Sequence, residues 1–132
     1  MKDFTNCSKV INGKVILNTT PHPINFDVDG AVVVVPNSPD ALLNAKAVEE
    51  VVSDDLVRTV FKSTEEGTAL VKEIEDWAAK AHPEATLRVV GSIIAAQAYP
   101  GSVVAMTPAK GFERVAPAEK RMNPSKFTTF QK

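Results

Sequence analysis

Residues 24–35 read INFDVDGAVVVV and decide the expected fold, because they place Asp-Gly between two β-prone runs. Asp-Gly is typical of a two-residue hairpin turn, in which both turn positions need a positive φ. Residues 10–17 repeat the pattern, with Asn12 and Gly13 at the turn. The two hairpins predict four strands in an antiparallel meander. A linker at 19–23 joins them and is stiff, because it holds two prolines.

One main helix is expected at about residues 64–82. Residues 63–66 (STEE) supply a capping box, and the proline at position 83 ends the run. Apolar residues recur on one face of this segment at helical spacing: Leu70, Val71, Ile74, Trp77, Ala78 and Ala81. We therefore expect an α+β domain, in which an antiparallel β-sheet of N-terminal hairpins is covered by this helix.

Several shorter elements complete the expected core. Ser38 before Pro39 favours a short helix over residues 39–46. Residues 93–99 predict either a short helix or the continuation of a strand. Three further β-prone runs are expected as strands, at residues 56–61, 86–90 and 103–106.

From residue 108 the pattern dissolves into a proline-containing segment that is basic. It holds more apolar anchors than a disordered tail does: Phe112, Val115, Met122, Phe127 and Phe130. We expect a single domain over residues 1–132, with an α+β core at 1–107 and an ordered, extended C-terminal arm at 108–132. The arm would wrap over its own domain or over a neighbour's.

Composition places the chain among ordinary globular proteins, with 44% apolar and 23% charged residues. The longest apolar run, residues 31–36, is far shorter than the roughly 20 residues of a membrane helix. The N-terminus has no apolar core of a signal peptide. With Cys7 as the single cysteine, no disulfide can form within one chain. We expect a cytoplasmic protein without a membrane partner.

The net charge of −1 hides an asymmetry along the chain. Residues 1–85 carry a net charge of −6, whereas residues 86–132 carry +5. This split predicts either an anion site or a face that docks on the acidic part of another copy, which would make the protein a homo-oligomer. A solvated basic tail is the plain alternative.

Patterns for catalysis and metal binding are sparse. Residues 25–30 match the opening of a calcium loop, but Pro36 stands where the closing glutamate is needed. His22 and His82 are the two histidines, too few for a hydrolytic zinc site. We assign no catalytic residue, no metal and no cofactor. The overall acidity argues against strong nucleic-acid binding.

Residues 18–24 (NTTPHPI) and 89–96 (VVGSIIAA) resemble two signature stretches of a family of small phage and mobile-element proteins. That family carries an Asn-x-Thr-Pro-His motif near the N-terminus and has no assigned catalytic residues. The arm departs from the family pattern at 111–115 and 119–122. The resemblance implies an accessory protein that works in the host cytoplasm if the chain is phage-encoded.

The expected function is non-enzymatic binding and sequestration of a phosphate-bearing small molecule, such as a cyclic nucleotide immune signal, as a counter-defence sponge. Cationic side chains would balance the phosphates, a Gly-Ser turn would add donors, and an aromatic ring would stack on a base. The expected ligand-binding residues are Arg114, Lys120, Arg121, Gly91, Ser92, Tyr99, Phe112 and His22. His22 is alternatively a hydrogen-bonded structural histidine. Two other functions stay open: a phage structural, assembly or protein-interaction module, and, less favoured, a nucleotide hydrolase.

Overall fold

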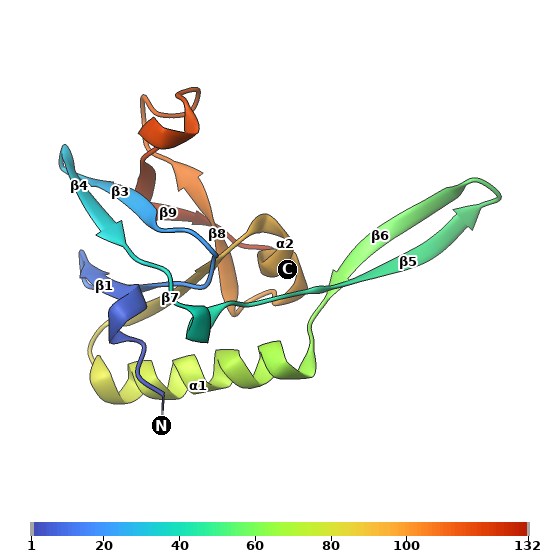
Figure 1. Ribbon diagram of the computed structural model, residues 1–132, viewed down its shortest axis with the longest axis horizontal. Helices are drawn as coiled ribbons and strands as arrows, with labels where there is room; N and C mark the ends of the chain where they lie inside the picture. The colour runs from blue at the N-terminus through green and yellow to red at the C-terminus, as the bar shows by residue number, and fades with distance from the viewer. Residues whose placement is uncertain (1, 132) are drawn as a thin grey trace.

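The computed structural model describes residues 2–131, which form a seven-stranded sheet, a separate two-stranded ribbon and two helices (Figure 1). The strand order of the large sheet is β1-β2-β7-β8-β9-β3-β4. Its strands are β1 (Ser8–Ile11), β2 (Lys14–Asn18), β3 (Ile24–Val28), β4 (Ala31–Val35), β7 (Thr86–Gly91), β8 (Val103–Pro108) and β9 (Met122–Thr128). The ribbon consists of β5 (Lys46–Ser53) and β6 (Leu56–Lys62). The helices are α1 (Glu65–Ala81) and α2 (Ile93–Ala98).

Both expected hairpins are confirmed. β1 pairs with β2 and β3 pairs with β4, each antiparallel. At the first turn, Asn12 and Gly13 have φ of 51° and 78°, and at the second, Asp29 and Gly30 have φ of 52° and 88°. Two consecutive positive φ values are the requirement of the type I′ turn.

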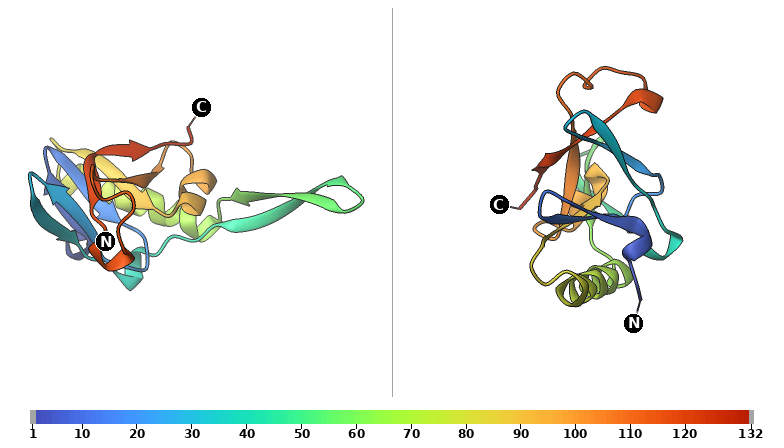
Figure 2. Two further views of the ribbon diagram at one scale, coloured as in Figure 1. Left: turned by 90° about the horizontal axis from the view of Figure 1, so that it is seen from above. Right: turned by 90° about the vertical axis from the view of Figure 1, so that its left-hand side faces the viewer.

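The expected fold class, an α+β domain with an antiparallel meander of N-terminal hairpins covered by one helix, is wrong, because the chain forms a mixed seven-stranded sheet. β2 does not pair with β3 but lies parallel to β7, and β3 lies parallel to β9. The sheet is therefore mixed, and it curls until its two edges come close, as the end-on view shows (Figure 2). The reason lies in Val15, Ile16 and Leu17, which are all fully buried. A strand that is apolar on both faces needs cover on both, which an open sheet with one helix does not give it.

Two cores result, one on each face of the curled sheet. Val15 and Leu17 point toward α1, where they join the cluster formed by Leu70, Val71, Ile74, Trp77 and Ala78. Ile16, one position out of phase, points to the other side. It packs there in a second cluster with Ile11, Ile24, Phe26, Val35 and Val90.

The main helix is confirmed at Glu65–Ala81. Its N-cap is Thr64, whose Oγ1 accepts a hydrogen bond from the Gly67 N–H at 2.9 Å. Trp77 is buried, and its ring meets the edge of Phe4 at a centroid distance of 5.8 Å. Among residues 2–131, neither helix has the length and apolar character needed to cross a membrane.

The extended C-terminal arm also needs correction, because its second half is a strand of the large sheet. β9 lies between β8 and β3 of its own chain. Its ladder is irregular: the register with β8 shifts between Met106 and Pro108, and Pro124 interrupts the strand without a donor of its own. The apolar anchors Met122 and Phe127 pack against the cluster inside the curled sheet, which explains why the arm is ordered.

The expected short helix at 39–46 is likewise wrong. A single 3-10 turn spans Pro39–Ala41, and the chain then runs into β5. The Ser38 cap itself is confirmed, since its Oγ accepts from the Asp40 N–H at 3.2 Å. β5 and β6 leave the body as a ribbon that projects away from it in every view (Figures 1 and 2).

Candidate functional site

The C-terminal arm and the β3–β4 hairpin enclose a pocket of about 340 Å³, which we call the basic pocket. Its lining residues are Asn25, Val32, Phe112, Val115, Ala118, Glu119, Lys120 and Arg121. The structure thus brings three of the expected ligand-binding residues together: Phe112, Lys120 and Arg121. Arg114 is exposed on the same loop.

Arg121 holds the arm against the β3–β4 turn. Its Nη1 donates to Asp27 Oδ1 at 3.0 Å and to the Gly30 carbonyl oxygen at 3.2 Å. Its guanidinium carbon lies 5.0 Å from the centroid of the Phe112 ring. The charge of Arg121 is therefore matched by Asp27, whereas Lys120 and Arg114 make no ion pair with any residue in 2–131.

Gly91 and Ser92 lie in another part of the molecule. Gly91 pairs with Ala105 on β8, whereas Arg121 meets the chain four residues further on, at Ala109. Gly91 is buried, and a Cβ atom there would lie 2.8 Å from Val103 Cγ1, so close packing accounts for the glycine. Ser92 is exposed and caps α2, where its Oγ accepts from the Ala95 N–H at 3.1 Å.

The Asn-x-Thr-Pro-His segment is a hydrogen-bonded knot around the buried side chain of Asn18. Asn18 Nδ2 donates to the carbonyl oxygens of His22, at 2.8 Å, and Val35, at 3.1 Å. Asn18 Oδ1 accepts from both the N–H and the hydroxyl of Thr20. The bond to Val35 ties the end of β2 to the end of β4, where no strand pairing closes the sheet. The His22 residue itself is exposed on this knot.

Tyr99 is buried under the root of the ribbon, and its hydroxyl connects the two ends of it. The hydroxyl donates to the Asn44 carbonyl oxygen at 2.8 Å and accepts from the Thr64 N–H at 3.0 Å. Asn44 precedes β5 and Thr64 follows β6. A Cβ atom at Gly67 would overlap the Tyr99 hydroxyl, so the glycine in the first turn of α1 makes room for this anchor.

The ribbon ends in an exposed segment, residues 51–57, that we call the ribbon tip. It carries four large aliphatic side chains, Val51, Val52, Leu56 and Val57, with exposed fractions of 82%, 54%, 58% and 52%. Val51 and Val57 face each other across the two strands. Asp54 and Asp55 form the turn, and Glu49 and Glu50 lie just below it. Arg58, which pairs with Glu50 at 3.7 Å, is the one cation in residues 49–58.

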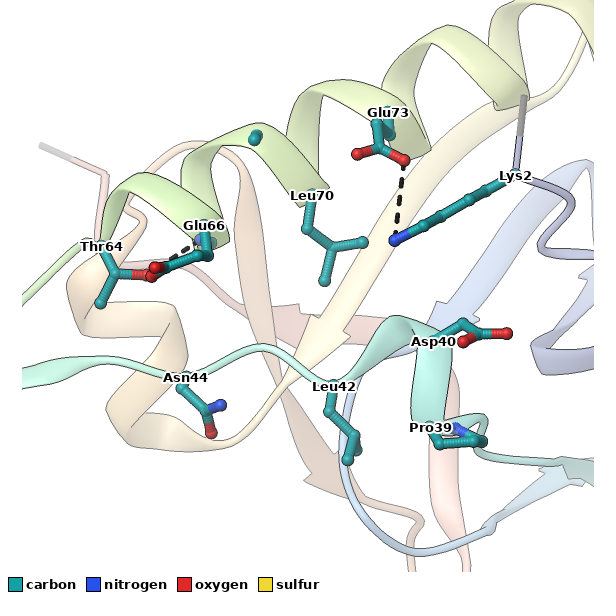
Figure 3. Close-up of a pocket in the computed structure, with 11 residues that line it drawn as sticks. Lys2, Pro39, Asp40, Leu42, Asn44, Thr64, Glu66, Leu70 and Glu73 are labelled. Atoms are coloured by element: carbon teal, nitrogen blue, oxygen red, sulfur yellow. Dashed lines mark hydrogen bonds and ion pairs between the residues drawn. The ribbon is translucent and has the colours of Figure 1, made fainter.

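Two larger hollows lie elsewhere on the surface. One, of about 640 Å³, lies where β6 meets α2 and the C-terminal end, and we call it the root groove. Its lining is apolar or neutral: Thr59, Val60, Phe61, Gln97, Pro100, Phe130 and Gln131. The other, of about 500 Å³, lies between α1 and residues 39–44 (Figure 3).

The groove beside α1 is acidic, with Asp40, Glu66 and Glu73 along it. Figure 3 shows Lys2 reaching across to Glu73, with Nζ 3.9 Å from Oε2. Both side chains are about half exposed, so the pair is solvated and contributes little to stability. Within residues 2–131 every buried side-chain nitrogen and oxygen has a hydrogen-bond partner.

Nucleophile and metal chemistry find little support in the described part of the chain. Burial, and then the nearby carboxylates of Asp40 and Asp3, raise the pKa of the Cys7 thiol to about 11. A neutral, buried thiol is a poor nucleophile. Residues 2–131 contain no group of three or more His, Cys, Asp or Glu side chains placed to hold a metal ion.

Comparison of the chain with models of protein families, with curated proteins and with solved structures finds no match in any of the three.

The ribbon tip is the surface that sequence reasoning missed. Residues 46–62 read KAVEEVVSDDLVRTVFK, two β-prone runs on either side of Ser-Asp-Asp. The turn holds no glycine and so lacks the usual hairpin signal. The clearest sequence signal for an exposed ribbon was that its valines and leucine lie next to acidic residues in the sequence. That pattern fits neither a buried strand nor the apolar face of a helix.

The Tyr99 anchor gives the first testable prediction. Tyr99→Phe keeps the buried ring but leaves the Asn44 carbonyl and the Thr64 N–H without their partner. Both hydrogen bonds are partly buried, and an intramolecular hydrogen bond contributes about 0.5–1.5 kcal/mol, so we expect the free energy of unfolding to fall by about 1 kcal/mol in a urea titration. Ser63→Ala is the matched control, since it removes an exposed hydroxyl next to the anchor. Equal stability of the two variants would contradict the role given to the Tyr99 hydroxyl.

Proposed function

We propose that this protein is a non-enzymatic interaction module that binds a protein partner through the ribbon tip. The observation that supports this is the exposure of Val51, Val52, Leu56 and Val57 at the end of a ribbon that the body does not cover. An isolated two-stranded hairpin is marginally stable in water. A ribbon that keeps its aliphatic side chains in solvent is better explained by a partner that covers them.

The energy available at the tip suits a reversible contact. Covering a half-exposed valine or leucine contributes roughly 1 kcal/mol, so four such side chains supply about 4 kcal/mol before the costs of association. The surrounding carboxylates of Asp54 and Asp55 favour a partner with a basic rim. They would also repel acidic surfaces, which adds selectivity to the hydrophobic contact.

A test by photo-crosslinking follows. With benzoyl-phenylalanine in place of Val57, we expect irradiation of living cells to give one discrete crosslinked product. The same group in place of Ala79, on the exposed face of α1, serves as the control and should give none. No product from position 57, or the same products from both positions, would contradict the proposal. The mass of the product shows whether the partner is another protein or a second copy.

The basic pocket supports a second candidate function, the sequestration of a phosphate-bearing small molecule. Lys120 lies beside the stacked pair of Arg121 and Phe112 in a hollow large enough for a nucleotide-sized group. A phosphate would pair with Lys120 and share Arg121 with Asp27. If the chain is phage-encoded, a cyclic nucleotide signal of the host would be the ligand class. We assign no residues to the hydrolase alternative.

A capture experiment tests this second function. The protein is incubated with cyclic nucleotides and cyclic ADP-ribose isomers, filtered and denatured, and the released compounds are analysed. Arg114→Ala with Lys120→Ala should lower capture at least about tenfold, since a charge-assisted hydrogen bond contributes about 1.5–3 kcal/mol. Lys126→Ala, outside the pocket, is the control. Arg121 is left intact because its loss would also break the Asp27 pair. Altered compounds on release would indicate an enzyme, and no captured compound would remove this candidate.

A further inference from the structure

We propose that the ribbon tip of one molecule docks into the basic pocket of a second copy of the chain. This inference rests on the proposed function, because it names the partner that the ribbon tip binds. The tip offers aliphatic side chains around two carboxylates, so its partner must offer an apolar hollow with cationic side chains at the rim.

The basic pocket has this composition. Val32, Phe112 and Val115 give it an apolar lining. Lys120 gives it an unpaired positive charge, whereas Arg121 is already paired with Asp27. Arg114 adds an exposed guanidinium on the same loop. Lys120 and Arg114 form no ion pair with an acidic residue in 2–131. Carboxylates from another molecule would therefore be able to pair with both.

Two larger hollows do not complement the tip. The root groove is apolar but has no charged lining residue, so it offers nothing to Asp54 and Asp55. The groove beside α1 is lined by Asp40, Glu66 and Glu73 and would repel the tip.

A fourth hollow, of about 350 Å³, is also apolar and cationic, with Lys14, Arg88, Val104 and Phe127 in its lining. The pocket-reversed protein described below distinguishes this hollow from the basic pocket, because it would stay dimeric if the tip docked in this hollow instead.

A contact within one molecule is excluded by the shape of the chain. The ribbon extends from one end of the body, and the loop that carries residues 109–121 lies on the part of the body away from it (Figures 1 and 2). The tip and the pocket of one chain therefore cannot meet while the Tyr99 anchor holds the ribbon root.

Two copies can each bind the ribbon tip of the other in their basic pocket. Each chain has one tip and one basic pocket, so two chains placed side by side and antiparallel exchange ribbons. Both contacts are then made at once. Such an exchange is a closed, two-fold symmetric dimer, in which no tip is left free to recruit further copies.

Charge reversal tests the contact. The tip-reversed protein carries Asp54→Lys and Asp55→Lys, and the pocket-reversed protein carries Arg114→Glu and Lys120→Glu. Light scattering after size exclusion at tens of micromolar should show a dimer for the unchanged chain and monomers for each variant. The dissociation constant should rise roughly a hundredfold or more, because juxtaposed like charges repel strongly. An equal mixture of the two variants should form a heterodimer, since both of its contacts pair opposite charges.

The control variant carries Glu75→Lys and Asp76→Lys on the exposed face of α1, with the same change of net charge as the tip-reversed protein, and it should stay dimeric. The proposal is overturned by a monomeric unchanged chain, by a monomeric control, or by a mixture that stays monomeric. All substituted residues are exposed, and circular dichroism checks their folding. Should a pair unfold, Asp55→Lys and Lys120→Glu alone give the same comparison. A monomeric chain that still crosslinks to another protein from position 57 would leave the proposed function standing and remove this inference.

Discussion

The hydroxyl of Tyr99 is the interaction on which the shape of the molecule depends. It joins Asn44, two residues before β5, to Thr64, the N-cap of α1, and so fixes both ends of the ribbon on one atom. Since the Thr64 side chain also caps α1 through Gly67, ribbon root and helix start form one unit. Tyr99 is the C-cap of α2, and α2 connects β7 to β8 along the chain. The direction of the ribbon is thereby coupled to the large sheet.

Local features of this fold were predictable from sequence because their causes are local. Asn12-Gly13 and Asp29-Gly30 determine their turns by backbone geometry, and the spacing of Leu70, Ile74 and Trp77 determines the buried face of α1. The pairing of distant strands was not predictable in this way. Nothing in residues 14–18 marks β7 as their neighbour, and the central place of β9 depends on how Met122 and Phe127 pack inside the curled sheet. The three consecutive apolar residues Val15, Ile16 and Leu17 were a sign in the sequence against an open meander, because they place apolar side chains on both faces of the strand.

The candidate site was likewise predictable from sequence only in part. A basic arm with aromatic anchors could be recognised from composition, and Phe112, Lys120 and Arg121 do line one pocket. Gly91, Ser92 and Tyr99 have residue types that suit such a site, but the sheet register pairs Gly91 with Ala105, four residues before Ala109, where the backbone bonds to Arg121. Arg121 also forms an ion pair with Asp27, which no sequence pattern predicts. We propose that the opposite charges of the two parts of the chain act between molecules, with the acidic ribbon tip of one copy facing the basic pocket of another.

Amide hydrogen exchange of the unmodified chain at low and high protein concentration tests this account most directly. Amides that a contact covers exchange more slowly as the contact becomes populated. We expect residues 51–57 and residues 112–121 to gain protection together as the protein concentration rises, while the exchange rates of the α1 amides stay unchanged. Exchange at both segments that does not depend on concentration, or protection that grows at the ribbon tip without growing at the basic pocket, would contradict it.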